Sequence, residues 1–161
     1  MSSVAVRSKP YFRKTTQWDI AELALTMRQE DVEEIFHASR GSPLGALVRG
    51  SEASTELISI VKQSKVVAIF GLVGTKGVSG SPWMLGTDEL PKCKSLLRDC
   101  RKIVQRYLEE YKYLSNACWS KNDVHIEWIK WLGFTFEGED IRNGETFLHF
   151  HKEIKCVNQQ R

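Results

Sequence analysis

Hydrophobic residues form one uninterrupted run in the middle of the chain, at residues 66–73. A run of this length between polar turns is typical of a strand that is covered on both faces. Strand-like patterns at residues 57–61 and 81–87 flank the run, and turns rich in polar residues or glycine separate the three segments. The pattern therefore predicts a sheet whose central strand, residues 66–73, has helices on both sides.

Helical periodicity precedes these strands. A first strand is expected over residues 9–15, and Thr16 followed by Asp19 then resembles a helix start, because the threonine can cap the first turn and the carboxylate favours the positive helix end. A second helix is expected over residues 29–38. Pro43 suits the first turn of a third helix, which reaches about residue 49.

The longest predicted helix begins at residue 88 or 91 and ends near residue 114. Its apolar positions recur at a spacing of about 3.6 residues and form one stripe: Leu97, Cys100, Val104, Tyr107, Leu108 and Tyr111. A short strand at residues 116–119 follows. Ser120 is then expected to cap another helix that ends at Gly133, because glycine accepts the left-handed conformation of a helix stop.

The last part of the chain reads as a hairpin. Residues 134–136 begin a strand, Asn143-Gly144 is a strong signal for a tight turn, and residues 146–151 return. Taken together, the pattern predicts an α/β fold with a mixed twisted sheet of six to seven strands and helices on both faces. Trp83 and Trp128 are expected to be largely buried.

Length and composition favour a single domain. The 161 residues suit one domain, with its core at about residues 11–154 and short tails at both ends. No apolar run approaches the roughly 20 residues of a membrane span, and the N-terminus lacks an apolar signal core. The net charge of +3 is mild, so it does not point to nucleic acid.

The cysteines and histidines do not predict a metal site. The four cysteines, at positions 93, 100, 118 and 156, match no zinc spacing and read as reduced, small apolar residues. His149 and His151 share one face of the predicted last strand, but no third ligand is evident. We therefore expect no metal.

Two charged helices leave alternatives open. In residues 29–38, Val32, Ile35 and Phe36 are expected to face inward. The acidic residues of this helix are either a solvated face or a wall that selects a cation: Glu30, Asp31, Glu33 and Glu34. The long helix is basic, which we interpret as a solubilising face. Lys92 and Lys94, near its start, are placed to converge on an anion together with the helix dipole.

One motif is more specific than these patterns. It reads Asn-x-x-His-x-x-x-Ile-x-x-Leu-Gly-Phe from Asn122 to Phe134. Together with the order of elements and an Arg-x-x-Thr-x-x-Asp opening at Arg13, it resembles the GNAT acetyltransferase superfamily over about residues 11–154. More narrowly, the chain is similar to the GNAT-like internal virion proteins of T7-like tailed phages.

The resemblance implies acetyl-CoA as cofactor, with its pantetheine arm between the strands at residues 83–86 and 116–119. It places the amine substrate beside the two N-terminal helices, near Arg28, Asp31 and Glu34. The residues expected to contact the cofactor are Met84, Leu85, Gly86, Lys92, Lys94 and Asn122.

Two departures from the family pattern bear on activity. The turn expected to hold the pyrophosphate, residues 87–92, lacks the family's two glycines and contains Asp88, Glu89 and Pro91. Ile129 occupies the position of the frequent thiolate-protonating tyrosine and has no proton to give. His125, Cys118 and Tyr107 remain as candidate catalytic residues.

The sequence thus supports two functional hypotheses. The first is a phage protein with a degenerate acyl-CoA site, acting with other phage proteins as an internal virion or assembly component, in the host cytoplasm during infection or in the virion. The second is a working N-acetyltransferase that modifies an amine of the host or phage. A nucleic-acid-binding module is a weaker third reading, because the basic helix lacks interleaved aromatic residues.

Overall fold

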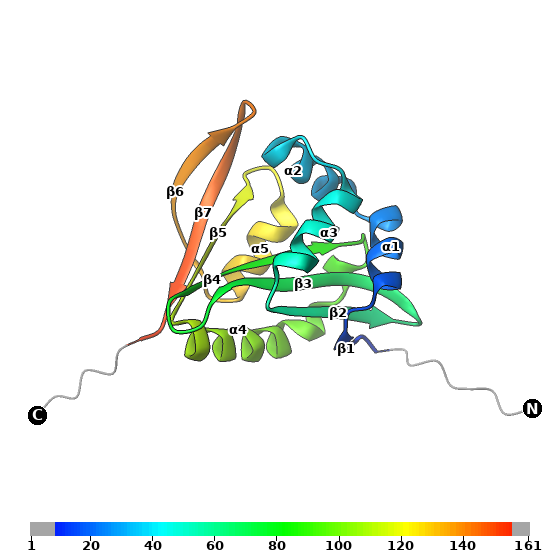
Figure 1. The fold of residues 1–161 in the computed structure, drawn as a ribbon, viewed down its shortest axis with the longest axis horizontal. Helices are drawn as coiled ribbons and strands as arrows, with labels where there is room; N and C mark the ends of the chain where they lie inside the picture. The colour runs from blue at the N-terminus through cyan, green and yellow to red at the C-terminus, as the bar shows by residue number, and fades with distance from the viewer. Residues whose placement is uncertain (1–8, 156–161) are drawn as a thin grey trace, which may run out of the picture.

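All strands belong to one mixed sheet. The structure is a computed structural model that describes residues 9–155, so the tails expected at both ends lie largely outside the described residues (Figure 1). The strand order is β1-β2-β3-β4-β5-β7-β6, and every neighbouring pair is antiparallel except β4–β5. The strands are β1 (Tyr11–Lys14), β2 (Glu56–Lys62), β3 (Lys65–Thr75), β4 (Ser79–Gly86), β5 (Tyr113–Trp119), β6 (Thr135–Arg142) and β7 (Glu145–Glu153).

Helices cover both faces of this sheet. They are α1 (Gln17–Thr26), α2 (Gln29–Ser39), α3 (Pro43–Ala53), α4 (Leu97–Tyr111) and α5 (Asp123–Trp131). The apolar residues of α1, α2 and α3 pack with Ile69 and Leu85 in one core, whereas those of α4 and α5 pack with Phe70 and Leu72 in another. Figure 1 shows the first three helices together on one side and α4 along the lower edge. The predicted α/β fold class is confirmed.

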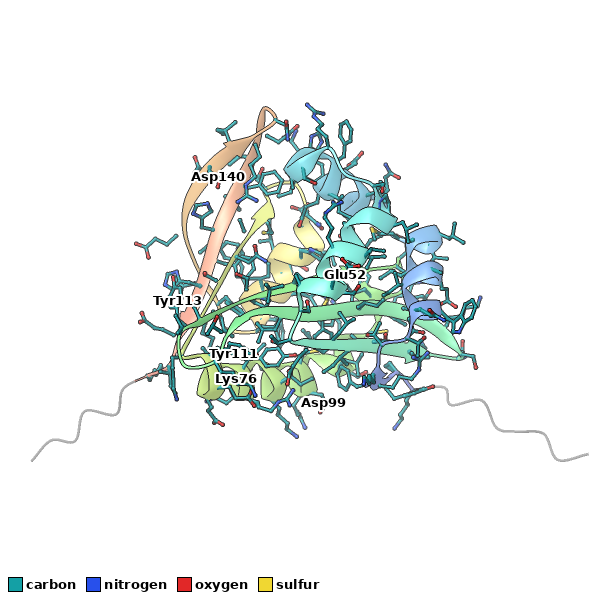
Figure 2. All side chains as sticks on the ribbon, in the orientation of Figure 1. Glu52, Lys76, Asp99, Tyr111, Tyr113 and Asp140 are labelled. Atoms are coloured by element: carbon teal, nitrogen blue, oxygen red, sulfur yellow. The ribbon has the colours of Figure 1, made fainter. Side chains whose placement is uncertain are left out.

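The predictions that rest on patterns of neighbouring residues are confirmed. The run at residues 66–73 lies in β3, whose side chains from Val66 to Leu72 are all buried. The hydroxyl of Thr16 accepts from the Asp19 N–H, and the Asp19 carboxylate accepts from the Thr16 N–H, which completes a capping box on α1. The six residues of the predicted stripe on α4 are all buried. Figure 2 shows one of them, Tyr111, with exposed Asp99 on the outer side of the same helix.

The predicted hairpin forms as well. Asn143 and Gly144 have φ angles of 50° and 81°, which are the positive values that a tight hairpin turn between β6 and β7 requires. The Asn143 amide also donates to the carbonyl oxygen of His37 at 2.6 Å. The tip of the hairpin is therefore tied to the end of α2.

Three helix boundaries and the orientation of one side chain differ from the prediction. The long helix starts only at Leu97, because residues 90–96 form two separate 3-10 turns around Cys93, whose ψ of 37° interrupts the helical path. It ends at Tyr111, and Leu114 already belongs to β5. Helix α5 begins after Asn122 rather than after a Ser120 cap. Phe36, expected inside, is 46% exposed and lies beneath the guanidinium of Arg40.

The parallel pair β4–β5 is joined at one point only. Gly80 pairs with Leu114, and the side-chain amide of Asn116 then donates to the carbonyl oxygen of Pro82 at 2.8 Å. No further ladder between these strands is present in residues 9–155. The two strands therefore diverge toward their carboxyl ends and leave a gap in the middle of the sheet.

Among residues 9–155, no helix is both long and apolar enough to cross a membrane.

The indole of Trp83 packs on the sheet beside this gap. Two glycines leave the space that the ring occupies. Its indole N–H donates to the Ser54 hydroxyl at 2.8 Å. A Cβ at Gly71 would lie 2.7 Å from the indole nitrogen, and one at Gly50 would lie 2.9 Å from the same ring. Trp128 is buried as predicted, and Trp83 is half-buried.

We expect Gly71→Ala to lower the free energy of unfolding by about 1–3 kcal/mol, the usual cost of overpacking, because the added methyl group forces Trp83 and Ser54 apart. Urea unfolding followed by tryptophan fluorescence measures this. Gly41→Ala is the matched control, because its Cβ approaches closely only the flexible ends of Arg49 and Ser39 and meets Ile35 at an ordinary contact distance of 3.5 Å. Equal stability of the two variants would contradict the packing role of Gly71.

Candidate functional site

A cavity of about 290 Å³ fills the gap between β4 and β5. It passes through the sheet, since Ala46 lines it from one core and Val104 with Trp128 line it from the other. Most of its wall is apolar, and the polar exceptions are few. An apolar cleft with a few convergent polar groups is the usual form of a small-molecule site.

The backbone of Met84 faces this gap. Backbone groups alternate in direction along a strand, and Thr87 N–H bonds to β3 through the Val67 carbonyl. By the same alternation Leu85 pairs with β3, while Met84 and Gly86 direct their groups toward β5. The Gly86 groups are occupied, since its N–H donates to Asp31 at 2.8 Å and its carbonyl accepts from the Arg28 N–H at 2.9 Å.

A buried polar cluster closes the carboxyl end of the gap. Asp31 is its centre and is fully buried. Besides the Gly86 N–H, its carboxylate accepts from the Arg28 guanidinium at 2.7 Å and from the Asn122 amide at 3.0 Å. The Asn122 carbonyl oxygen accepts from Arg28 at 3.0 Å. The cluster thus ties the start of α2, the end of β4 and the start of α5 together.

Glu34 and His125 extend this cluster to the cavity wall. Glu34 accepts from the Asn122 amide at 2.8 Å and from the Trp119 N–H at 3.2 Å. His125 Nε2 lies 3.3 Å from Asp31, and its Nδ1 lies 4.0 Å from Glu34. Both Glu34 and His125 line the cavity. They are the titratable groups that a bound molecule would meet first.

The pKa values of this cluster are shifted by burial and by mutual attraction. Burial alone would raise the pKa of Asp31, but His125, Arg28 and Asn122 outweigh it and hold that pKa below its ordinary value. For Glu34 the effect of burial exceeds that of its favourable partners, His125 and Asn122, and raises the pKa. Burial would lower the pKa of His125, yet the carboxylates of Asp31 and Glu34 raise it. The imidazole therefore lies between two carboxyl groups that favour its charged form.

The acidic residues of α2 do not form one solvated face. Glu30 is half exposed and touches Arg28 at 3.3 Å, whereas Asp31 is fully buried and the Glu34 side chain is 16% exposed. The solvated reading is wrong for Asp31 and Glu34, because buried cationic and amide partners satisfy their oxygens. The Arg28–Asp31 spacing of three residues was the one local signal for this pairing.

The other predicted site residues lie in different places. Met84 and Leu85 line the cavity, as do the catalytic candidates His125, Cys118 and Tyr107. Burial raises the pKa of the Cys118 thiol to about 12 and that of the Tyr107 hydroxyl beyond its ordinary range. Neither group is therefore activated as a base or nucleophile at neutral pH.

Gly86 and Asn122 belong to the polar cluster above the cavity, and Lys92 and Lys94 lie outside the cavity wall. Cys93, Cys100 and Cys118 are buried free thiols, and Cys156 lies outside the described residues. Within residues 9–155 no cluster of three or more ligands for a metal occurs.

Several solved structures that share this arrangement of elements are acetyltransferases. An acetyltransferase of the GNAT family from Bacillus anthracis matches with a TM-score of 0.67 at 10% identity, over 92% of this chain and 97% of its own. The Microcin C7 self-immunity acetyltransferase MccE, in complex with acetyl-CoA and AMP, matches with a TM-score of 0.67 at 14% identity, over 92% and 94%. The chain has the GNAT fold.

A further structure agrees with this assignment. AAC(6′)-Ib in complex with ribostamycin and coenzyme A matches with a TM-score of 0.66 at 12% identity, over 95% of this chain and 98% of its own. No protein-family model matches the sequence, and no curated protein is significantly similar to it. At such low identities the likeness is one of fold, so the site has to be judged on its own residues.

The segment between β4 and α4 does not suit the pyrophosphate of coenzyme A. Backbone N–H groups cradle phosphate only when they are free. Here the N–H groups of Leu90, Lys92, Cys93 and Leu96 donate to carbonyl oxygens within the same segment, and that of Glu89 donates to the Thr87 hydroxyl. Pro91 has no N–H to offer. The segment is closed on itself as two 3-10 turns.

The side chains of this segment do not replace the missing donors. Asp88 and Glu89 are exposed carboxylates, and the Lys92 ammonium is paired with Glu89 at 3.0 Å. The four charged side chains of this segment, Asp88, Glu89, Lys92 and Lys94, carry no net positive charge. The segment therefore does not provide a fitted site for the pyrophosphate of coenzyme A.

We expect Asp31→Asn to lower the free energy of unfolding by about 3–5 kcal/mol, because it leaves the Arg28 guanidinium buried without its carboxylate. Chemical unfolding measures the change. Glu30→Gln removes the exposed contact of the same guanidinium and should cost less than about 1 kcal/mol. A loss of similar size in both variants would show that the buried pair has no special role.

The stability of the protein should depend on pH through His125. Its folded-state pKa is raised above the ordinary value of 6.5, so its contribution is complete below pH 6.5 and is lost as the pH rises through the raised value. We expect the melting temperature of His125→Gln to fall less over this window than that of the wild type. His151→Gln, outside the cluster, is the control and should follow the wild type. An NMR titration of His125 midway at or below 6.5 would refute the charged imidazole.

Proposed function

We propose that this chain is a GNAT-fold protein with a degenerate acyl-CoA site, which serves as an assembly or internal component of a phage particle. The degenerate acyl-CoA site is supported by the segment between β4 and α4, which is closed on itself as two 3-10 turns. The N–H groups of Glu89, Leu90, Lys92, Cys93 and Leu96 are used internally, and Asp88 and Glu89 add two exposed carboxylates. Coenzyme A carries several negative charges at that end, so binding there would be opposed by electrostatic repulsion.

The assembly role rests on the sequence resemblance to internal virion proteins of T7-like phages. The partners would be other phage structural or assembly proteins, and the protein would be found in the host cytoplasm during infection or in the virion. A GNAT fold kept for binding rather than catalysis agrees with the absence of an activated proton donor at Ile129. The buried polar cluster then has a structural role in closing the gap.

The second candidate is an N-acetyltransferase that uses acetyl-CoA and acts on a small-molecule or protein amine. One observation favours it. Glu34 lines the cavity from α2, where the resemblance places the amine, and His125 lines it from α5; a carboxylate in an apolar wall attracts a cation. Among the similar structures, MccE is an acetyltransferase with acetyl-CoA bound, and AAC(6′)-Ib has coenzyme A bound.

Calorimetric titration with acetyl-CoA distinguishes the two functions. We expect no saturable heat and no rise in melting temperature at millimolar acetyl-CoA, because the phosphates find no donors. AAC(6′)-Ib, which forms a complex with coenzyme A, is the positive control for the assay. Micromolar binding with a raised melting temperature would reject the degenerate site in favour of the acetyltransferase, and amines would then be screened.

A further inference from the structure

Helix α1 carries large apolar residues on its solvent side. Trp18 and Leu25 are 74% and 88% exposed, and Ala21 between them is exposed as well. The three recur at i, i+3 and i+7, so they form one stripe along the helix, which we call the α1 face. A single exposed apolar residue is ordinary, but two large ones on one stripe indicate a contact surface.

The acidic residues of the same helix are used inside the molecule. Asp19 is 4% exposed and accepts from the Arg13 guanidinium at 2.8 Å and from the Ser59 hydroxyl at 2.9 Å. Glu22 accepts from the backbone N–H of Val66 in β3. A helix that is apolar on both sides is typical of one that packs on both sides. Figure 1 shows α1 at the right-hand margin of the fold, where no element within residues 9–155 covers its outer side.

The charged residues that border the α1 face leave a positive rim. Lys14 precedes the helix, and Lys65 is adjacent to Val66, which Glu22 ties to α1. Both lysines are exposed, and neither forms an ion pair within the described part of the chain. The carboxylates in this region have partners inside the molecule: Asp19 with Arg13, Glu22 with Val66, Glu30 with Arg28, and Glu89 with Lys92. A bound partner therefore meets an apolar stripe beside unpaired cations.

The size and charge of this surface suit one helix of another protein better than a second copy of the chain. Leu44 and Val48 are further exposed apolar residues on α3, which packs against α1. Together with the α1 face they offer apolar surface on the order of 500 Å². A stable homodimer needs about 800 Å² from each partner. Two copies would also bring the same positive rims together, and like charges repel.

We propose that the α1 face is a docking site for an amphipathic helix of a partner protein, with acidic residues on the flanks of its apolar stripe. The apolar stripe of the partner packs against Trp18 and Leu25, and its carboxylates pair with Lys14 and Lys65. This assignment concerns the outer side of α1 and holds whether or not the acyl-CoA site is degenerate.

A synthetic helical peptide of about 20 residues, long enough to form an isolated helix, is the probe. Its leucines recur at i, i+3 and i+7, and glutamates occupy both flanks; a second peptide has lysines in place of the glutamates. We expect saturable binding of the acidic peptide to the full chain by fluorescence anisotropy, and at least tenfold weaker binding of the basic peptide. The difference should shrink at high salt, because exposed charges are screened.

Substitutions on the surface of α1 locate the site. Trp18→Gln and Leu25→Gln should each weaken binding of the acidic peptide at least tenfold, and both should fold because the positions are exposed. Ile141→Gln is the matched control, since Ile141 is 66% exposed but lies on β6 at the opposite edge of the sheet, and it should bind like the wild type. Lys65→Glu should weaken the acidic peptide and strengthen the basic one.

Several results would overturn the docking site. Equal binding of the two peptides would refute the acidic partner, and binding that survives both Trp18→Gln and Leu25→Gln would refute the location. A dimer in sedimentation velocity that Leu25→Gln abolishes would assign the face to a second copy. Binding to phosphatidylglycerol vesicles in place of the peptide would assign it to a membrane surface. No saturable binding of the acidic peptide would reject the proposal and leave the proposed function untouched.

Discussion

The carboxylate of Asp31 is the interaction on which the centre of the structure depends. It accepts hydrogen bonds from Gly86, Arg28 and Asn122, which lie on β4, before α2 and before α5. A sheet whose middle strands diverge loses the ladder that would otherwise hold their ends in place. Here a buried anion supplies that connection, because each of its oxygens reaches a donor from a different element. The pairing with the buried Arg28 guanidinium at 2.7 Å allows this carboxylate to stay buried.

The divergence of β4 and β5 has a second cause in the side chains. Asn116 places its amide against Pro82, so the ladder ends one step after Gly80–Leu114. Proline has no N–H to continue it. Beyond this point bulky apolar residues from both cores meet across the gap and keep it open. The GNAT fold is thus maintained here by one polar cluster and by packing, to which Leu90, Cys93 and Leu96 of the segment between β4 and α4 contribute.

The fold was largely predictable because its main signals are local. The apolar run of β3, the capping box at Thr16 and the Asn143-Gly144 turn each depend on a few adjacent residues. The start of α4 was not predictable, since the 3-10 turns carry no periodicity that differs from a helix. The candidate site was harder to predict from the sequence, because its residues come from distant parts of the chain. Asp31 and Glu34 read as solvated charges until Asn122 and His125, about 90 positions later, are placed beside them.

The distribution of the polar cluster along the chain constrains how the sequence can vary. Its charges and amides come from two short segments, one from Arg28 to Glu34 and the other from Asn122 to His125. A substitution in either segment leaves a buried polar group of the other segment without its partner. Two such losses would lower the free energy of unfolding by more than a domain of ordinary stability can tolerate. The two segments therefore have to change together. In related sequences, an apolar residue at position 31 should be accompanied by the loss of the cation at position 28 and of the amide at position 122.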